Sequence, residues 1–301
     1  MNSTVILKGN ILYTPRPSEF ISIQHGYIIA VDGVVVYCGE SIPPAYADRE
    51  VTDYGDNLII PGFVDTHAHA PQYCNRGLGM DKELLPWLET YTFPEEAKFS
   101  DLDYARLVYG AFVQDLWRNG TTRSILFGTI HKESTLVLME LLQKAGLSAY
   151  VGKVNMDCNS PDFLIEETSQ SLADTKDWLE ASAQFGPLVK PIITPRFVPS
   201  CTSELMDGLG TLSEEYKVPV QSHLSENHGE IDWVGALHPE SPNYTDVYYE
   251  HKLMGRTPTV MAHCIHLSDV EMDRMAETQT MVSHCPYSNV NLSSGIAPIR
   301  K

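Results

Sequence analysis

The sequence is poor in basic residues. Lys and Arg number 21 against 39 Asp and Glu, so the formal net charge of the 301 residues is −18. A chain this acidic repels phosphate backbones and anionic lipid, so we expect neither nucleic acid nor a membrane surface as a partner. No stretch approaches the roughly 20 apolar residues of a membrane-spanning helix. The N-terminus has no basic region before a long apolar run, which argues against a secretory signal.

Closely spaced cysteine pairs are also absent. The chain has six cysteines, and none of them forms a Cys-x-x-Cys motif. A chain of this length does not need disulfides for stability, so we expect reduced thiols in a cytoplasmic protein. The glycine-rich fingerprint of nucleotide-binding proteins is missing too, which disfavours a doubly wound sheet.

The first part of the chain is rich in short β-type runs. Residues 1–57 contain such runs with Gly, Pro and Asp-Gly between them, and Asp32-Gly33 lies between two apolar runs. Asp-Gly in this setting is a strong hairpin signal. We therefore predict a small antiparallel β domain, sandwich-like and incomplete, over residues 1–57.

From residue 58 to 301, strand-like and helix-like segments alternate. The expected strands are 58–69, 121–127, 148–157, 188–197, 219–226, 259–264 and 280–285. Helices are expected over 103–120 and over 134–146, the latter with Ser134 as its N-cap and Gly146 as its C-terminal stop. Alternation of this kind predicts an α/β fold, here a (β/α)₈-type barrel with seven of its eight strands.

Histidines recur where these strands end. His67 and His69 end the first strand, and His223, His263 and His284 lie at the ends of the fifth, sixth and seventh. The carboxyl ends of barrel strands share one mouth, so these side chains can converge. A single histidine at a strand end is usually structural, but imidazole is also a common zinc ligand. Histidines at four of the seven strand ends therefore favour a metal site.

Two carboxylates accompany the histidines. Glu226 follows His223 by three residues and could move protons at a metal site, although an acidic residue also suits the first turn of a helix. Asp65 precedes His67 and either orients an imidazole or caps the strand end. No lysine lies at the exit of strand 188–197 to bridge two metals, which favours one ion.

Several segments together carry a family resemblance. PGFVDTHAH, QSHLSE, MAHC and SHCPYSN resemble motifs of the amidohydrolase superfamily. HAPQYCNRGLGMDKELLPWLETYTFPEEAKF, with GTIH, VGKVNMD and TPRF, resembles the guanine deaminases within it. The likeness extends over the whole chain. It implies a zinc enzyme of purine catabolism that hydrolyses guanine to xanthine and ammonia, and a homodimer.

The resemblance also implies roles for individual residues in the reaction. His67, His69 and His223 match the zinc-binding histidines. Glu226 matches the proton shuttle, and His263 matches the histidine beside the metal and the attacking water. Iron also suits histidine ligands, so the residues alone do not choose between the two metals.

Three further residues match those that hold the purine. Gln72 and Arg196 correspond to residues that hydrogen-bond its polar edge, and Phe197 to one that packs against its face. Without the resemblance, Arg196 reads equally as a partner in a strand-end salt bridge and Phe197 as a core aromatic.

The resemblance also implies a missing part. The family has an eighth strand ending in an Asp that completes the metal site, whereas the last acidic residue here is Glu277. We therefore expect this chain alone to hold zinc weakly and to turn over little guanine. Two alternatives stay open: a non-catalytic form that pairs with full-length subunits, and a deaminase of another amino-purine, a triazine or a pterin.

Overall fold

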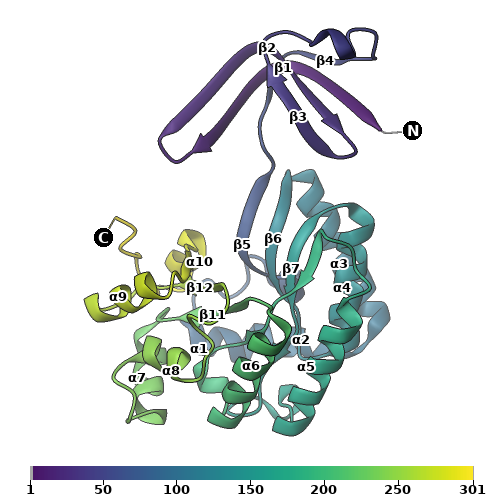
Figure 1. Cartoon of the computed structure of the whole chain (residues 1–301). Coiled ribbons are helices and arrows are strands. Elements are labelled where there is room, and N and C mark those ends of the chain that lie inside the picture. The colour runs from purple at the N-terminus through teal and green to yellow at the C-terminus, as the bar shows by residue number, and fades with distance from the viewer. Residues whose placement is uncertain (1–2, 301) are drawn as a thin grey trace. The chain divides into compact units, whose positions relative to one another are not determined.

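The computed structural model describes residues 3–300 and divides into two compact units, Met1–Phe63 and Val64–Lys301 (Figure 1). The N-terminal unit is one four-stranded sheet of order β3-β2-β1-β4. Its strands are β1 (Thr4–Arg16), β2 (Glu19–Val31), β3 (Val34–Gly39) and β4 (Thr52–Ile59).

The hairpin predicted at Asp32-Gly33 is confirmed. These two residues connect β2 to β3 and have φ of 50° and 80°, which is the left-handed pair of a tight hairpin turn. The prediction of a purely antiparallel sheet is wrong, because β4 pairs with β1 in parallel. The chain reaches that position through a crossover that contains a short 3₁₀ turn, Pro44–Tyr46.

The segment predicted as one strand over 58–69 is two strands. Leu58 and Ile59 still pair with β1, so they belong to the N-terminal sheet and the units divide at Phe63 rather than at residue 57. The next strand, β5, begins at Phe63. Pro61 lies between them and has no N–H to donate, so it interrupts the hydrogen-bond ladder.

The second unit alternates strands and helices along the chain. Its strands are β5 (Phe63–His69), β6 (Thr121–Phe127), β7 (Ser148–Gly152), β8 (Val154–Asn155), β9 (Val189–Pro191), β10 (Thr194–Pro195), β11 (Val220–Leu224), β12 (Thr259–His263) and β13 (Met281–Ser283). Its helices are α1 (Leu84–Trp87), α2 (Phe93–Glu96), α3 (Leu102–Arg118), α4 (Lys132–Ala145), α5 (Thr168–Ser182), α6 (Ser203–Tyr216), α7 (His228–Leu237), α8 (Tyr244–Glu250), α9 (Asp269–Glu277) and α10 (Pro286–Asn291). Shorter turns of helix fill several connections, among them Ala70–Asn75 after β5 and Val198–Ser200 after β10.

The strands form an open barrel of the predicted type. Their orders are β5-β6-β7-β9, β10-β8 and β11-β12-β13, and an isolated parallel bridge from Ile193 to Val220 joins neighbouring segments. Among the described residues, no backbone pairing links β5 to β13. Their side chains do meet, because the hydroxyls of Thr66 and Ser283 lie 2.6 Å apart. The α/β fold class is thus confirmed, with the barrel not closed.

Six of the described helices begin with a side-chain cap, whereas α1, α2, α4 and α10 do not. The carboxylate of Asp101 accepts from the backbone of Asp103 and Tyr104 and so caps α3. The prediction of Ser134 as the N-cap of α4 is wrong, because the helix begins at Lys132. Ser134 is buried inside its first turn, where the hydroxyl bonds to the His131 carbonyl.

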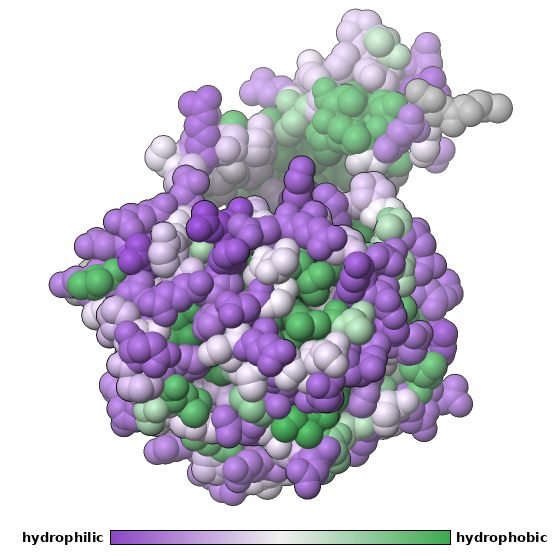
Figure 2. Space-filling view, turned by 60° about the horizontal axis from the view of Figure 1, so that its bottom comes forward, coloured by the Kyte–Doolittle hydropathy of each residue, from purple (hydrophilic) through white to green (hydrophobic). Residues whose placement is uncertain are grey.

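Apolar helix faces cover the strands of the second unit and form its main core. Trp178, Tyr109 and Leu138 are fully buried there. Full burial of an apolar side chain such as Leu138 stabilises the fold by about 1.5–3 kcal/mol relative to exposure. Figure 2 shows a largely hydrophilic face on this unit, as the acidic composition predicts. Among the described helices, none combines the length and apolar character needed to cross a bilayer.

Candidate active site

Three histidines from two strands converge at one point. His67 and His69 alternate on β5, so both rings point to the same side of the sheet, and His223 lies on β11. The Nε2 atoms of His69 and His223 are 2.9 Å apart, and the ring centroids of His67 and His223 are 4.8 Å apart. One ligand atom from each residue lies within 4.8 Å of the others, so the three could hold a metal ion.

The protonation of these rings suits a metal. Burial, together with the neighbouring imidazoles, holds the pKa of His67, His69 and His223 well below the usual range. The rings are therefore neutral near pH 7, the form that can donate a lone pair to a cation. The His223 Nδ1 lies 2.6 Å from the Arg196 carbonyl and donates to it, which leaves Nε2 as the free ligand atom.

The spacing of the ligand nitrogens supports the same interpretation. Two nitrogens at about 2.0–2.1 Å from a tetrahedral zinc would be about 3.3 Å apart, close to the spacing of the His69 and His223 Nε2 atoms. The donor set and its geometry thus fit a zinc-type ion.

Glu226 and His263 lie beside this cluster. Glu226 Oε2 is 3.3 Å from His263 Nε2, and both side chains are almost completely buried. Burial raises the pKa of Glu226 to about 8, so the carboxyl can both give and take a proton near neutral pH. The other ring nitrogen of His263, Nδ1, is held by Asn289, whose Oδ1 lies 2.8 Å away.

The backbone around these two residues is strained. Ser225, His263 and Cys264 have φ of 49°, 70° and 50°, a region that non-glycine residues rarely occupy. The amide of Cys264 donates to the Leu224 carbonyl, which ties the ends of β11 and β12 together. Strain of this kind is often concentrated where side chains must be aimed at a reaction centre.

Glu230 is a buried carboxylate that sequence reasoning missed. It accepts from the backbone amide of Glu226 at 2.9 Å and from the Tyr244 hydroxyl at 2.7 Å. It also closes the capping box of α7 with Asn227. The Asn-x-x-Glu spacing was the available signal in the sequence. Glu230 therefore fixes the backbone on which Glu226 stands.

Gln72, Arg196 and Phe197 form the opposite wall. Arg196 is buried and forms an ion pair with Glu96, and its guanidinium lies 5.1 Å from the centre of the Phe93 ring. Phe197 is buried and meets Trp233 edge-on. Gln72 follows β5 in a 3₁₀ turn and donates to Glu96 at 3.1 Å.

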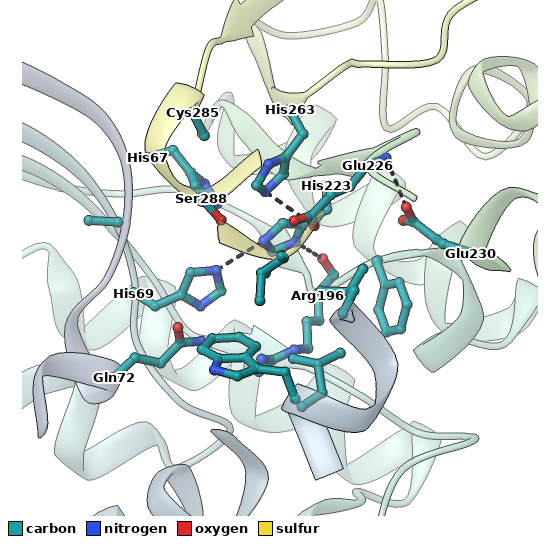
Figure 3. A pocket seen from close by; sticks show the side chains of 16 residues that line it. His67, His69, Gln72, Arg196, His223, Glu226, Glu230, His263, Cys285 and Ser288 are labelled. Carbon is teal, nitrogen blue, oxygen red and sulfur yellow. Dashed lines mark hydrogen bonds and ion pairs between the residues drawn. The ribbon is translucent and has the colours of Figure 1, made fainter. Parts of the chain in front are cut away.

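All eight predicted site residues line one cavity of about 220 Å³ in the second unit. Figure 3 shows the histidines and Glu226 around one side of this cavity and Gln72 with Arg196 on the other. Sequence reasoning missed the apolar part of the lining, to which Leu84, Trp87 and Leu292 contribute. These residues have no pattern that separates them from ordinary core positions.

Two other sequence candidates have a different place. His284 does not line the cavity, and its Nδ1 is buried without a partner among the described residues. The Asp65 carboxylate accepts from the backbone amide of His67 at 3.1 Å. The sequence left two roles open for Asp65, orienting an imidazole or capping the strand end. This bond to the backbone is of the capping kind.

Known proteins resemble this chain over most of its length. It is 52% identical to guanine deaminase of Dictyostelium discoideum over 84% of this chain and 56% of that protein. It is 40% identical to guanine deaminase of Escherichia coli K12 over 95% of this chain and 66% of that protein. The chain thus spans little more than half the length of the Dictyostelium relative and about two thirds of the bacterial one.

Solved structures agree with the fold described above. Guanine deaminase from C. acetobutylicum, solved with guanine bound in the active site, has a TM-score of 0.97 and 51% identity over 99% of this chain and 71% of that one. A triazine hydrolase shares only the fold, at 16% identity and a TM-score of 0.87. Residues 58–301 match the amidohydrolase family, which is metal-dependent. The chain therefore belongs to the amidohydrolase family.

Proposed function

We propose that the protein hydrolyses guanine to xanthine and ammonia with one zinc ion. The observation that carries the proposal is the single cavity that brings together three neutral histidines, the Glu226 carboxyl and a hydrogen-bonding wall of Gln72 and Arg196. The relative whose structure was solved with guanine bound, at 51% identity over 99% of this chain, supports guanine as the substrate.

His67, His69 and His223 would hold the metal. Their buried, neutral rings fit zinc better than a hard cation, which prefers oxygen ligands. A zinc ion in this position supplies Lewis-acid activation of a water molecule at neutral pH.

Glu226 would carry the protons of the reaction. It takes one proton from the water and delivers it to the ring nitrogen next to the carbon that bears the exocyclic amine. The water oxygen forms a bond to that carbon, and the carbon–amine bond then breaks. The second proton of the water goes through Glu226 to the departing amine, which leaves as ammonia. His263 lies 3.3 Å from Glu226 Oε2 and holds that carboxyl in reach of the reacting atoms.

Gln72, Arg196 and Phe197 would hold the purine. The first two offer hydrogen bonds to its polar edge, and the buried Phe197 ring offers a flat apolar surface to its face. A purine with a mismatched edge leaves these buried groups unpaired, a penalty that can reach about 10⁴-fold in selectivity.

The test is a substrate panel on the zinc-loaded protein. Guanine should be converted, at the low rate expected above, to equal amounts of xanthine and ammonia, and metal analysis of the zinc-supplemented protein should find zinc bound. Faster hydrolysis of adenine, a pterin or a triazine than of guanine would overturn the substrate assignment. Activity with iron but not with zinc would overturn the metal assignment.

We further propose a homodimer, which the family resemblance supports, and a cytoplasmic location, which the six cysteines without a Cys-x-x-Cys pair favour. Light scattering of the purified protein measures the subunit number, and fractionation of the source cells measures the location. A monomer, or recovery outside the cytoplasmic fraction, would contradict the corresponding part of the proposal.

A further inference from the structure

Gln72 and Arg196 bind the same buried carboxylate. Glu96 is only 1% exposed and lies at the end of α2. Its Oε1 accepts from the Gln72 side-chain nitrogen at 3.1 Å, and its Oε2 accepts from Arg196 Nη1. Both side chains that line the polar wall of the cavity are therefore positioned by one residue that does not line it.

This carboxylate decides which way the Gln72 amide faces. An ionised carboxylate has acceptors only, so the amide must turn its nitrogen toward Glu96 and its oxygen away. Figure 3 shows the Gln72 side-chain oxygen on the side of the amide that faces the histidines. Gln72 thus presents an acceptor to the cavity, whereas the reversed amide would present a donor.

Glu96 also neutralises the buried charge of Arg196. A buried guanidinium without a partner is strongly unfavourable, so the ion pair keeps Arg196 in the wall. Arg196 has five N–H groups and the contact with Glu96 uses one nitrogen, so others remain for a ligand. The wall therefore offers an acceptor at Gln72 and a donor at Arg196.

We propose that Glu96 is a positioning residue that fixes this acceptor–donor order and so makes the cavity select a ring lactam. A lactam edge has an N–H next to a carbonyl, which matches an acceptor beside a donor. Guanine has this edge at N1 and C6. Adenine has the reverse order at this edge, with an acceptor at N1 and a donor at the 6-amino group. Its acceptor would therefore face the Gln72 acceptor, and its donor would face the Arg196 donor. The inference rests on the proposed function, because it assumes that a purine occupies this cavity.

Hypoxanthine and adenine are suitable probes. They differ only at this edge, and neither carries the 2-amino group that the proposed reaction removes. The ratio of their dissociation constants, measured by calorimetry on the zinc-loaded protein, isolates the preference for the lactam. We expect the unaltered protein to prefer hypoxanthine by about 100-fold or more, within the range for a site whose buried groups would be left unpaired.

The decisive variant is Glu96→Gln. The amide it introduces can donate to Gln72, which lets the Gln72 amide reverse, and it removes the charge that pairs with Arg196. We expect the hypoxanthine preference to fall by about tenfold or more. Glu96→Asp is the second variant, since it keeps the charge beside Arg196 and so favours folding. Its shorter side chain cannot reach both partners, and the preference should fall here too.

Glu95→Gln is the matched control. Glu95 neighbours Glu96 on α2, is also buried, and bonds to Tyr104 and Lys98 instead of the cavity wall. The Glu95→Gln substitution should change stability but leave the ratio of the hypoxanthine and adenine dissociation constants within about twofold, because Glu95 shares no partner with Glu96. Melting temperatures of all variants show which are folded.

Each outcome has one meaning. A lower ratio in both Glu96 variants and an unchanged ratio in Glu95→Gln supports the inference. Equal weakening of both ligands, with the ratio kept, would mean that Glu96 is only structural and would overturn it. Equal weakening in the Glu96 variants would still leave the proposed function intact, provided that the unaltered protein deaminates guanine. If it neither deaminates guanine nor binds hypoxanthine, the proposed function fails and the inference fails with it.

Discussion

Glu226 Oε2 lies 3.3 Å from His263 Nε2, and both groups are shielded from water. The second carboxylate oxygen of Glu226 has no partner among the described residues. One oxygen is therefore held in place while the other is free to meet a substrate or a water. This division suits a group that must keep its position while its proton comes and goes.

Replacing Glu226 by Gln should abolish proton transfer without disturbing the fold. We expect guanine turnover to fall by about 10²–10⁴-fold, the usual contribution of a positioned acid–base group. Zinc content should stay unchanged. A coupled assay for xanthine and metal analysis measure both quantities. Glu240→Gln is the control, since Glu240 is 69% exposed at its side chain and lies outside the cavity. Full activity in Glu226→Gln would remove Glu226 from the mechanism.

The same carboxyl should make the stability of the metal-free protein depend on pH. Burial raises the pKa of Glu226 to about 8 from an ordinary value of 4.5. The folded state therefore holds the proton more tightly than the unfolded state. The stabilisation is complete below about pH 4.5 and is lost as the pH rises toward 8, by up to about 1.4 kcal/mol per pH unit.

Urea unfolding at a series of pH values, with a chelator present, measures this loss. Burial also raises the pKa of Glu230, to about 7, so the Glu230 carboxyl also makes the free energy of unfolding fall as the pH rises. The comparison is therefore made against Glu226→Gln, which cannot ionise at this position. Its free energy of unfolding should fall less steeply between pH 5 and 8 than that of the unaltered protein. Parallel curves would contradict the assigned pKa.

Zinc should stabilise the chain through the three-histidine cluster. A ligand at 100 times its dissociation constant raises the free energy of unfolding by about 2.7 kcal/mol. We expect zinc to raise the melting temperature of the unaltered protein and to have little effect on His67→Ala. His25→Asn is the control, because His25 is exposed in the N-terminal unit. An equal shift in His67→Ala would place the metal elsewhere.

A buried ion pair away from the histidines should be costly to break. Lys153 is fully buried and its Nζ lies 2.6 Å from Glu166 Oε1. Replacing Lys153 by Met leaves a carboxylate without its countercharge, and we expect a loss of about 3–5 kcal/mol in urea unfolding. Lys132→Met is the comparison, since Lys132 pairs with Asp174 and Asp177 nearer the surface and should cost about 0–1 kcal/mol. Equal losses would refute the burial argument.

Local sequence predicted the elements better than their limits. Segment 121–127 is a strand as expected, and Gly146 ends α4 in the left-handed conformation. The start of α4 was placed too late, because a buried Ser134 inside the first turn has the same sequence appearance as a cap. The strand expected over 148–157 is two short strands, β7 and β8, which pair with different neighbours. Register between distant segments decides such a break, and no local pattern records it.

The sequence by itself determined the alternation of strands and helices, the turn at Asp32-Gly33 and the residue types that metal chemistry needs. Those depend on backbone preference and on the chemistry of single side chains. Only the tertiary structure decided that Glu96 holds both Gln72 and Arg196. These contacts join segments far apart in the chain, and burial gives them their strength. Such contacts exist only once the strands have brought their ends together, so they depend on the packed fold and not on neighbouring residues.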